Sequence, residues 1–261
     1  MSVHFVDTHC HFDFPPFTGA EAESLHLAQQ SGVRDIIVPA VTADRFHGIL
    51  SLAKKFPQLY AALGLHPLYI AQHTDDDLAL LDTLLSQRDP RVVAVGEIGL
   101  DLFMETPMFE QQQRLLKAQF ALAKRESLPV ILHSRRSHDQ LAAMLRQAKL
   151  PAIGVVHGFA GSLSQAQAFI RLGFAIGVGG TISYARAQKT RQVMAQLPLS
   201  SLLLETDAPD MPLQGFQGQP NRPERAAAVF DVLCELRPES PEDIAAALLA
   251  NTRRVFNLPS Y

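Results

Sequence analysis

The chain has 261 residues, of which 47% are hydrophobic and 19% charged, enough apolar sequence to bury a large core. A formal net charge of −3 excludes a grossly basic nucleic-acid binder but leaves room for a local basic surface. Cys10 and Cys234 are the only cysteines, which indicates a reducing compartment. We expect a soluble cytoplasmic protein, since no signal peptide is evident and no apolar run approaches the ~18 residues of a membrane span.

Short apolar runs alternate with longer helix-like stretches along the whole chain. The apolar runs predict strands over residues 5–7, 35–39, 59–64, 92–96, 129–132, 153–156, 174–178 and 202–204. The intervening stretches predict helices over 21–31, 42–56, 75–86, 105–127, 137–148, 162–172, 188–196, 223–236 and 241–255. Thr42 is the expected N-cap of the second helix.

This alternation favours parallel strands joined by helical crossovers. Eight strands suggest an α/β fold of the (β/α)8 type, a TIM-like barrel formed by a single domain over residues 1–261. An open doubly wound sheet is the alternative. No composition shift or short repeat marks a second domain.

Two histidines follow the first predicted strand, at positions 9 and 11. In an extended chain, residues two apart point to the same side. His9 and His11 can therefore direct both imidazoles at one point, while Cys10 faces away and is expected to be a packed thiol. This is the geometry that neighbouring ligands of a metal ion require.

Further ligand-type side chains stand close to the ends of other predicted strands. In a parallel barrel these ends share one face, where catalytic residues gather. Imidazoles and carboxylates suit Zn, Mn, Ni, Co or Mg, and the set exceeds what one tetrahedral ion needs. It is large enough for two divalent ions bridged by a carboxylate and a water. The residues are His9, His11, Glu97, His133, His157 and Asp207.

Five motifs follow one another along nearly the whole chain. They are Asp7-Thr8-His9-Cys10-His11-Phe12, Gly96-Glu97-Ile98-Gly99-Leu100-Asp101, His133-Ser134-Arg135, His157-Gly158-Phe159 and Glu205-Thr206-Asp207-Ala208-Pro209. With these motifs the chain resembles the TatD family of metal-dependent hydrolases, TatD-type DNases of the amidohydrolase-like superfamily, and in particular their YjjV-type branch.

The resemblance implies a TIM-like barrel with two divalent ions and, where activity is assigned, hydrolysis of phosphodiester bonds in DNA, often exonucleolytic. It implies that His9, His11 and Asp207 bind one ion. His133 and His157 then bind the other, and Glu97 bridges the two.

Physical chemistry suggests how such a site would work. Two ions would lower the pKa of a bridging water and hold the attacking and leaving oxygens. Asp207 could accept the proton of this water or act only as a ligand. Asp7 could orient a ligand histidine or make a strand-end hydrogen bond.

Several side chains near the predicted site are candidates for substrate contact. His66, which ends the third strand, could contact a phosphate or pack in its loop. Arg135 could reach a phosphate or remain solvated. The same choice applies to Arg186, Lys189 and Arg191 after the seventh strand.

Two further segments bear on substrate range. Residues 177–180, Gly-Val-Gly-Gly, lack the Walker lysine and the full dinucleotide spacing, so we interpret them as a loop that allows close approach. Residues 221–223 read Asn-Arg-Pro, where many members of the family resembled carry Asn-Glu-Pro. This departure puts substrate range in doubt more than metal binding.

The leading hypothesis is a metal-dependent phosphodiesterase that acts on DNA, with a 3'-5' exonuclease as one form. The second is a metal-dependent amidase or esterase acting on a small molecule or an aminoacyl-RNA. The third is a non-catalytic metal-binding protein, against which the intact ligand set argues. Basic side chains at the mouth of the site would favour the first, and a closed, partly apolar pocket the second.

Overall fold

An eight-stranded sheet forms the centre of the molecule in the computed structural model, which describes residues 4–152 and 154–259. The strands pair in chain order and every neighbouring pair is parallel. They are β1 (Phe5–Asp7), β2 (Val33–Pro39), β3 (Leu59–Leu63), β4 (Val92–Asp101), β5 (Val130–Arg135), β6 (Val155–Val156), β7 (Ala175–Val178) and β8 (Leu202–Leu204).

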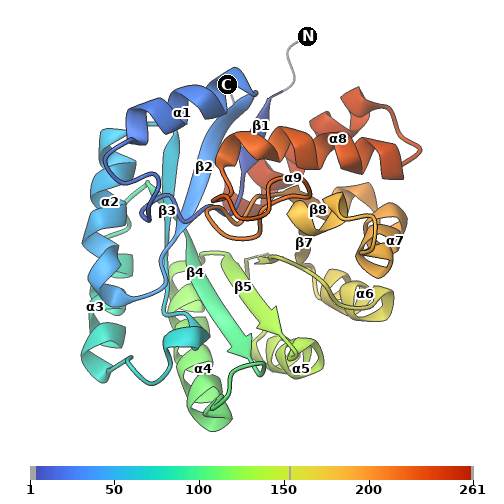
Figure 1. The fold of residues 1–261 in the computed structure, drawn as a ribbon. Helices are drawn as coiled ribbons and strands as arrows, with labels where there is room; N and C mark the ends of the chain where they lie inside the picture. The colour runs from blue at the N-terminus through green and yellow to red at the C-terminus, as the bar shows by residue number, and fades with distance from the viewer. Residues whose placement is uncertain (1–3, 153, 260–261) are drawn as a thin grey trace.

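Helices surround the sheet on the outside (Figure 1). They are α1 (Glu21–Gln30), α2 (Phe46–Lys55), α3 (Asp75–Ser86), α4 (Phe109–Glu126), α5 (His138–Ala148), α6 (Leu163–Arg171), α7 (Gln188–Gln196), α8 (Ala226–Leu236) and α9 (Pro241–Phe256). Within the described residues, none of the helices has both the length and the apolar character needed to cross a membrane.

The sheet closes on itself between its last and first strands. The backbone N–H of Thr8 donates to Leu204 O at 3.0 Å, and that of Asp207 donates to His9 O at 2.8 Å. Cys10 then pairs with Ala208 in a parallel bridge. The (β/α)8 prediction is therefore confirmed, and the open doubly wound alternative is wrong.

Alternate strand residues face two separate cores, as the period of a strand requires. Ile36 and Val38 of β2 face outward and belong to the large cluster that includes helical residues such as Phe46. Ile37 between them belongs to a smaller cluster inside the barrel, which Phe256 of α9 joins. Both faces of each strand are thus buried, which explains the continuous apolar runs in the sequence.

Two strands extend further than predicted. The fourth strand ends at Asp101 rather than 96, and the fifth at Arg135 rather than 132. Their added residues pair with each other, Gly99 with His133 and Asp101 with Arg135. The sequence did not indicate this extension because Glu97, Asp101 and His133 interrupt the apolar run, where the imidazole contacts both carboxylates.

Three helices begin three or more residues later than predicted, and the one expected from 223 starts at Ala226 after a 3₁₀ turn over Pro223–Arg225. The helix predicted from 105 begins at Phe109, because the Gln112 side chain bonds Asp101 O and N and so holds the preceding segment in a loop. The helix predicted from Thr42 begins with a short 3₁₀ turn, and Thr42 caps it without a side-chain hydrogen bond. The predicted start of the sixth strand, residue 153, lies outside the described residues.

We expect Asn251 of α9 to stabilise the end of the barrel where the strands begin. Its side-chain amide donates to Leu199 O and Leu202 O, both at 2.9 Å, and the residue is 5% exposed. Asn251→Ala leaves two buried carbonyl oxygens without this hydrogen-bond donor. This should lower the free energy of unfolding by about 1–3 kcal/mol. Urea unfolding should show a lower midpoint for this variant. Gln147→Ala, on the exposed face of α5, is the control, and equal midpoints would contradict the assignment.

Candidate metal centre

Closure of the barrel brings His9 and His11 together with Asp207. The two Nε2 atoms of the histidines lie 3.3 Å apart. Asp207 Oδ1 lies 3.5 Å from His9 Nε2 and 3.6 Å from His11 Nε2. Asp207 has a φ of 60°, a left-handed conformation that costs a non-glycine residue free energy and is often found at functional sites. The i, i+2 spacing therefore places both imidazoles as predicted.

The carboxylate of Glu97 stands at the centre of the site and is 1% exposed. Its two oxygens divide the surrounding imidazoles into two sets. Oε2 lies 3.1 Å from His9 Nε2 and 3.5 Å from His11 Nε2. Oε1 lies 2.7 Å from His157 Nε2, 2.9 Å from His66 Nε2 and 3.1 Å from His133 Nδ1.

A bulge in β4 directs Glu97 inward. Val95 pairs with Val130 and Ile98 with Leu132, so three steps on β4 match two on β5. Bulges of this kind change the direction of a side chain next to a functional site. Small residues flank the bulge, since a Cβ on Gly96 would lie 2.6 Å from Ile131 Cβ and one on Gly99 would overlap the backbone of His133. These glycines therefore allow the backbones of β4 and β5 to approach closely.

The electrostatics of this cluster favour a cation. Burial raises the pKa of Glu97, but His157 and the other imidazoles outweigh it and hold the pKa well below its usual range. Burial lowers the pKa of His157, yet the Glu97 charge raises it to about 10. The negative charge of Glu97 thus attracts positive charge to the centre of the cluster. Because imidazole nitrogen and carboxylate oxygen are good donors to divalent metals, the residues fit such an ion.

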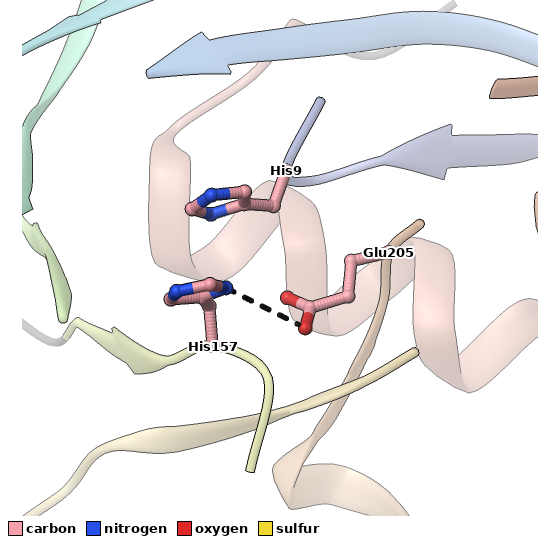
Figure 2. A group of neighbouring side chains, drawn as sticks. All are labelled: His9, His157 and Glu205. Carbon is pink, nitrogen blue, oxygen red and sulfur yellow. Dashed lines mark ion pairs between the residues drawn. The ribbon is translucent and has the colours of Figure 1, made fainter. Parts of the chain in front are cut away.

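A third group of possible ligands lies beside this carboxylate and comprises His9, His157 and Glu205 (Figure 2). The rings of the two histidines stack with centroids 3.7 Å apart, and Glu205 Oε1 lies 3.9 Å from His157 Nδ1. Glu205 is fully buried and accepts a hydrogen bond from Gly158 N at 2.5 Å. Sequence reasoning missed this residue, although its two-residue spacing from Asp207 was a signal for it.

Asp101 is a second residue whose position the sequence did not indicate. It lies on β4 rather than on a loop, is 2% exposed, and its Oδ2 lies 2.8 Å from His133 Nε2. The other oxygen accepts a hydrogen bond from Phe103 N at 2.9 Å. Asp101 therefore fixes the orientation of the His133 ring.

Asp7 makes the strand-end hydrogen bond that the sequence offered as one alternative, to the backbone of His9 rather than to its ring. Its Oδ1 accepts hydrogen bonds from the backbone N–H of His9 at 3.2 Å and of Thr206 at 3.0 Å. It therefore joins the loops after β1 and β8. Cys10, as predicted, is a fully buried free thiol within the apolar core.

A cavity of about 770 Å³ opens above the cluster, and His66 lies in its wall. Of the basic candidates, Arg135 and Lys189 line it, and Arg136 does so in addition. Arg191 does not act there through its guanidinium, which donates to Ile182 O at 2.5 Å. The cavity wall therefore carries three cationic side chains as well as carboxylates such as Asp207 and Asp210.

The unusual arginine after Asn221 is held within the protein. Arg222 Nε lies 2.5 Å from Glu224 Oε1, and its Nη2 donates to Ser24 Oγ at 3.3 Å. Asn221 is fully buried and donates to Thr206 O at 2.9 Å, which supports the loop that carries Asp207. This segment therefore contacts the loop after β8 through the backbone carbonyl of Thr206.

The arrangement can now be compared with known proteins. The family model for TatD-related DNases matches residues 6–257. The chain belongs to the TatD family. It is 62% identical to the metal-dependent hydrolase YjjV of Escherichia coli over 99% of this chain and 100% of that protein. The crystal structure of YjjV covers the same shares of the two chains with a TM-score of 0.98.

Another relative in the TatD family carries a more specific name. The chain is 33% identical to a protein of Erwinia tasmaniensis named 3'-5' ssDNA/RNA exonuclease TatD, over 88% of this chain and 91% of that one. This TatD-family protein is therefore a metal-dependent hydrolase, as the motifs implied. Its fold carries clusters of histidines and carboxylates that could hold metal ions.

Within this TatD-family site, Gly177 of β7 should be intolerant of a side chain. A Cβ there would overlap the carboxylate of Glu205, whereas a Cβ on Gly179 would meet its nearest atom at 3.6 Å. We expect Gly177→Ala to lower the free energy of unfolding by about 1–3 kcal/mol and to reduce bound metal, because the buried carboxylate must move. Urea unfolding and metal analysis measure both. Gly179→Ala is the matched control, and identical behaviour of the two variants would refute the contact.

Proposed function

We propose that this protein is a two-metal phosphodiesterase that degrades single-stranded DNA, in the 3'-5' direction. The observation that carries the proposal is the central Glu97 carboxylate, with a separate set of imidazoles at each of its oxygens. We assign residues 1–261 to one hydrolase domain, supported by a family match over 6–257.

His9, His11 and Asp207 would hold one ion, and His133 and His157 the other, with Glu97 shared between them. The tautomers of two rings support this assignment. His11 Nδ1 lies 3.1 Å from the carbonyl oxygen of Pro39, and His133 Nε2 lies 2.8 Å from the Asp101 carboxylate. Each of these nitrogens must carry the hydrogen, so the other nitrogen offers a lone pair toward Glu97, as metal-ligating histidines do.

His66 has the opposite tautomer, which suits contact with substrate. Its Nδ1 accepts a hydrogen bond from Leu68 N at 3.0 Å, so the ring hydrogen is on Nε2, facing Glu97. Burial lowers the pKa of His66 to about 4, and the ring is therefore neutral at pH 7. An Nε2–H group cannot ligate a cation but can donate to a phosphate oxygen.

Bound divalent ions would supply an activated water and neutralise charge on a phosphodiester. The chain would contribute the rest. The Asp207 carboxylate, 20% exposed at its side chain, can accept a proton from the water. Arg135, Arg136 and Lys189 at the cavity wall provide positive charge for the phosphates that flank the scissile bond.

The experiment that tests the proposal compares substrates. The metal-loaded protein is given labelled single-stranded DNA, bis(p-nitrophenyl) phosphate and a panel of acyl amides and esters. Cleavage of the DNA supports the proposal. Turnover confined to the acyl panel would instead support the small-molecule or aminoacyl-RNA alternative.

Glu97→Gln should keep the fold but lose the second ion and nearly all turnover. The amide keeps the shape of the carboxylate, removes its negative charge and presents a nitrogen that ligates poorly. Asp101→Ala removes only a hydrogen-bond partner of His133 and should lower turnover roughly 10–100-fold. The loss of turnover in Glu97→Gln should be larger. Metal content and turnover are measured, with Glu110→Gln on the exposed face of α4 as control. Two ions retained at a normal rate would refute the shared-ligand role.

Affinity for a single-stranded oligonucleotide should fall steeply as salt rises. Three cationic side chains at the cavity predict a slope of about −2 in log affinity against log salt, at about −0.7 for each phosphate neutralised. Lys189→Ala should make the slope shallower by about 0.7, because one contact is lost. Lys124→Ala, on the outer face of α4, should leave it unchanged. An affinity that does not respond to salt would favour the small-molecule alternative.

A further inference from the structure

An exposed aromatic ring lies against two arginines that line the cavity. Phe103 follows the end of β4 and is 47% exposed. The guanidinium carbon of Arg135 lies 3.8 Å from its ring centroid, and that of Arg136 lies 4.4 Å from it. We name these three residues the rim cluster.

Backbone hydrogen bonds fix the rim cluster relative to the metal centre. Phe103 N donates to Asp101 Oδ1 at 2.9 Å, and the other oxygen of Asp101 contacts His133 Nε2 at 2.8 Å. Leu102 N donates to Arg135 O at 2.9 Å, which ties the two strand ends together. Arg135 follows His133 by two residues on β5, or about 7 Å along the strand. The cluster is therefore about one nucleotide from the reacting phosphate.

The charges of the two arginines are available to a ligand. In the part of the chain that the structure describes, neither guanidinium lies within 4.0 Å of a carboxylate oxygen. Asp101, the register partner of Arg135, is already engaged by His133 and by Phe103 N. Arg136 also has a φ of 53°, a conformation that glycine would adopt at lower cost. An arginine there is best explained by what its side chain binds.

We propose that the rim cluster is a nucleotide-binding platform. The nucleobase next to the scissile phosphate stacks on Phe103 and the guanidinium planes, and Arg136 binds the phosphate of that nucleotide. This inference rests on the proposed function and specifies how single strands are held. An aromatic ring combined with positive charge is the usual means of holding single strands, and it tolerates any sequence because every base has a π-face. Paired bases cannot stack in this way, so the platform also selects unpaired ends.

The test measures how the metal-loaded protein binds a phosphorothioate oligonucleotide that resists cleavage, with an abasic site placed at each terminal position in turn. Phe103→Leu keeps the apolar bulk but removes the flat ring, and should weaken binding about tenfold. Phe103→Tyr keeps the ring and should bind like the unchanged protein. One terminal position should hold the base that stacks on the ring. An abasic site there should weaken binding to the unchanged protein about as much as Phe103→Leu weakens binding of the intact strand. The same abasic site should not weaken binding to Phe103→Leu any further, because the stacking contact is already lost.

Charge is tested with a matched pair of arginines. Arg136→Ala should reduce the salt dependence of binding by about one phosphate contact. Arg146→Ala removes the same charge from the last turn of α5, which lies at the opposite end of the barrel, and should have no effect. Urea unfolding of each variant checks that the effects are not losses of stability.

The outcomes separate this inference from the proposed function. If the unchanged protein binds and cleaves single-stranded DNA while Phe103→Leu binds normal and abasic strands as tightly, the platform is refuted and the proposed function stands. If the unchanged protein neither binds nor cleaves single-stranded DNA, the proposed function fails and the platform with it. A lower unfolding midpoint with normal binding would show that the rim cluster serves only the fold.

Discussion

The structure depends on how a carboxylate is buried at the centre of a barrel. A charged group removed from water is very costly unless partners surround it, and Glu97 is 1% exposed. The fold meets this cost with imidazoles at both oxygens, and a bulge in β4 directs the side chain toward them. Two glycines in the same strand let the neighbouring backbone come close enough. The site is thus built into the register of the sheet rather than added on its loops.

Closure of the barrel is the second constraint, because the ligand candidates come from both ends of the chain. Asp7 bonds the backbone of Thr206 and of His9, and so holds the loop after β8 against the loop after β1. Asn221 supports the same loop from outside. A defect at this junction would separate His9 from Asp207, so the geometry of the cluster depends on closure of the barrel. At the other end of the barrel, Val255 and Phe256 of α9 pack into the inner core.

A third feature connects the imidazole cluster to the rim cluster. Asp101 contacts the His133 ring with one oxygen and the backbone of Phe103 with the other. A single buried carboxyl group therefore fixes both a side chain of the metal centre and the position of the rim cluster. The cationic side chains Arg135 and Arg136 thus stand beside the cavity although the chain is acidic overall.

The sequence alone determined the barrel and six of the side chains that meet at the site. These follow from local periodicity: apolar runs alternate with helices, and His9 and His11 share one side of an extended chain. Tertiary structure decided what local patterns do not encode. It showed that Glu205 and Asp101 lie beside these imidazoles and that Asp7 bonds backbone rather than a ring. It also showed which ring nitrogen carries the hydrogen in His11, His66 and His133. These features depend on how strands that are distant in the sequence pair with one another. The β4 bulge and the junction between β8 and β1 fix this pairing, and both exist only in the assembled sheet.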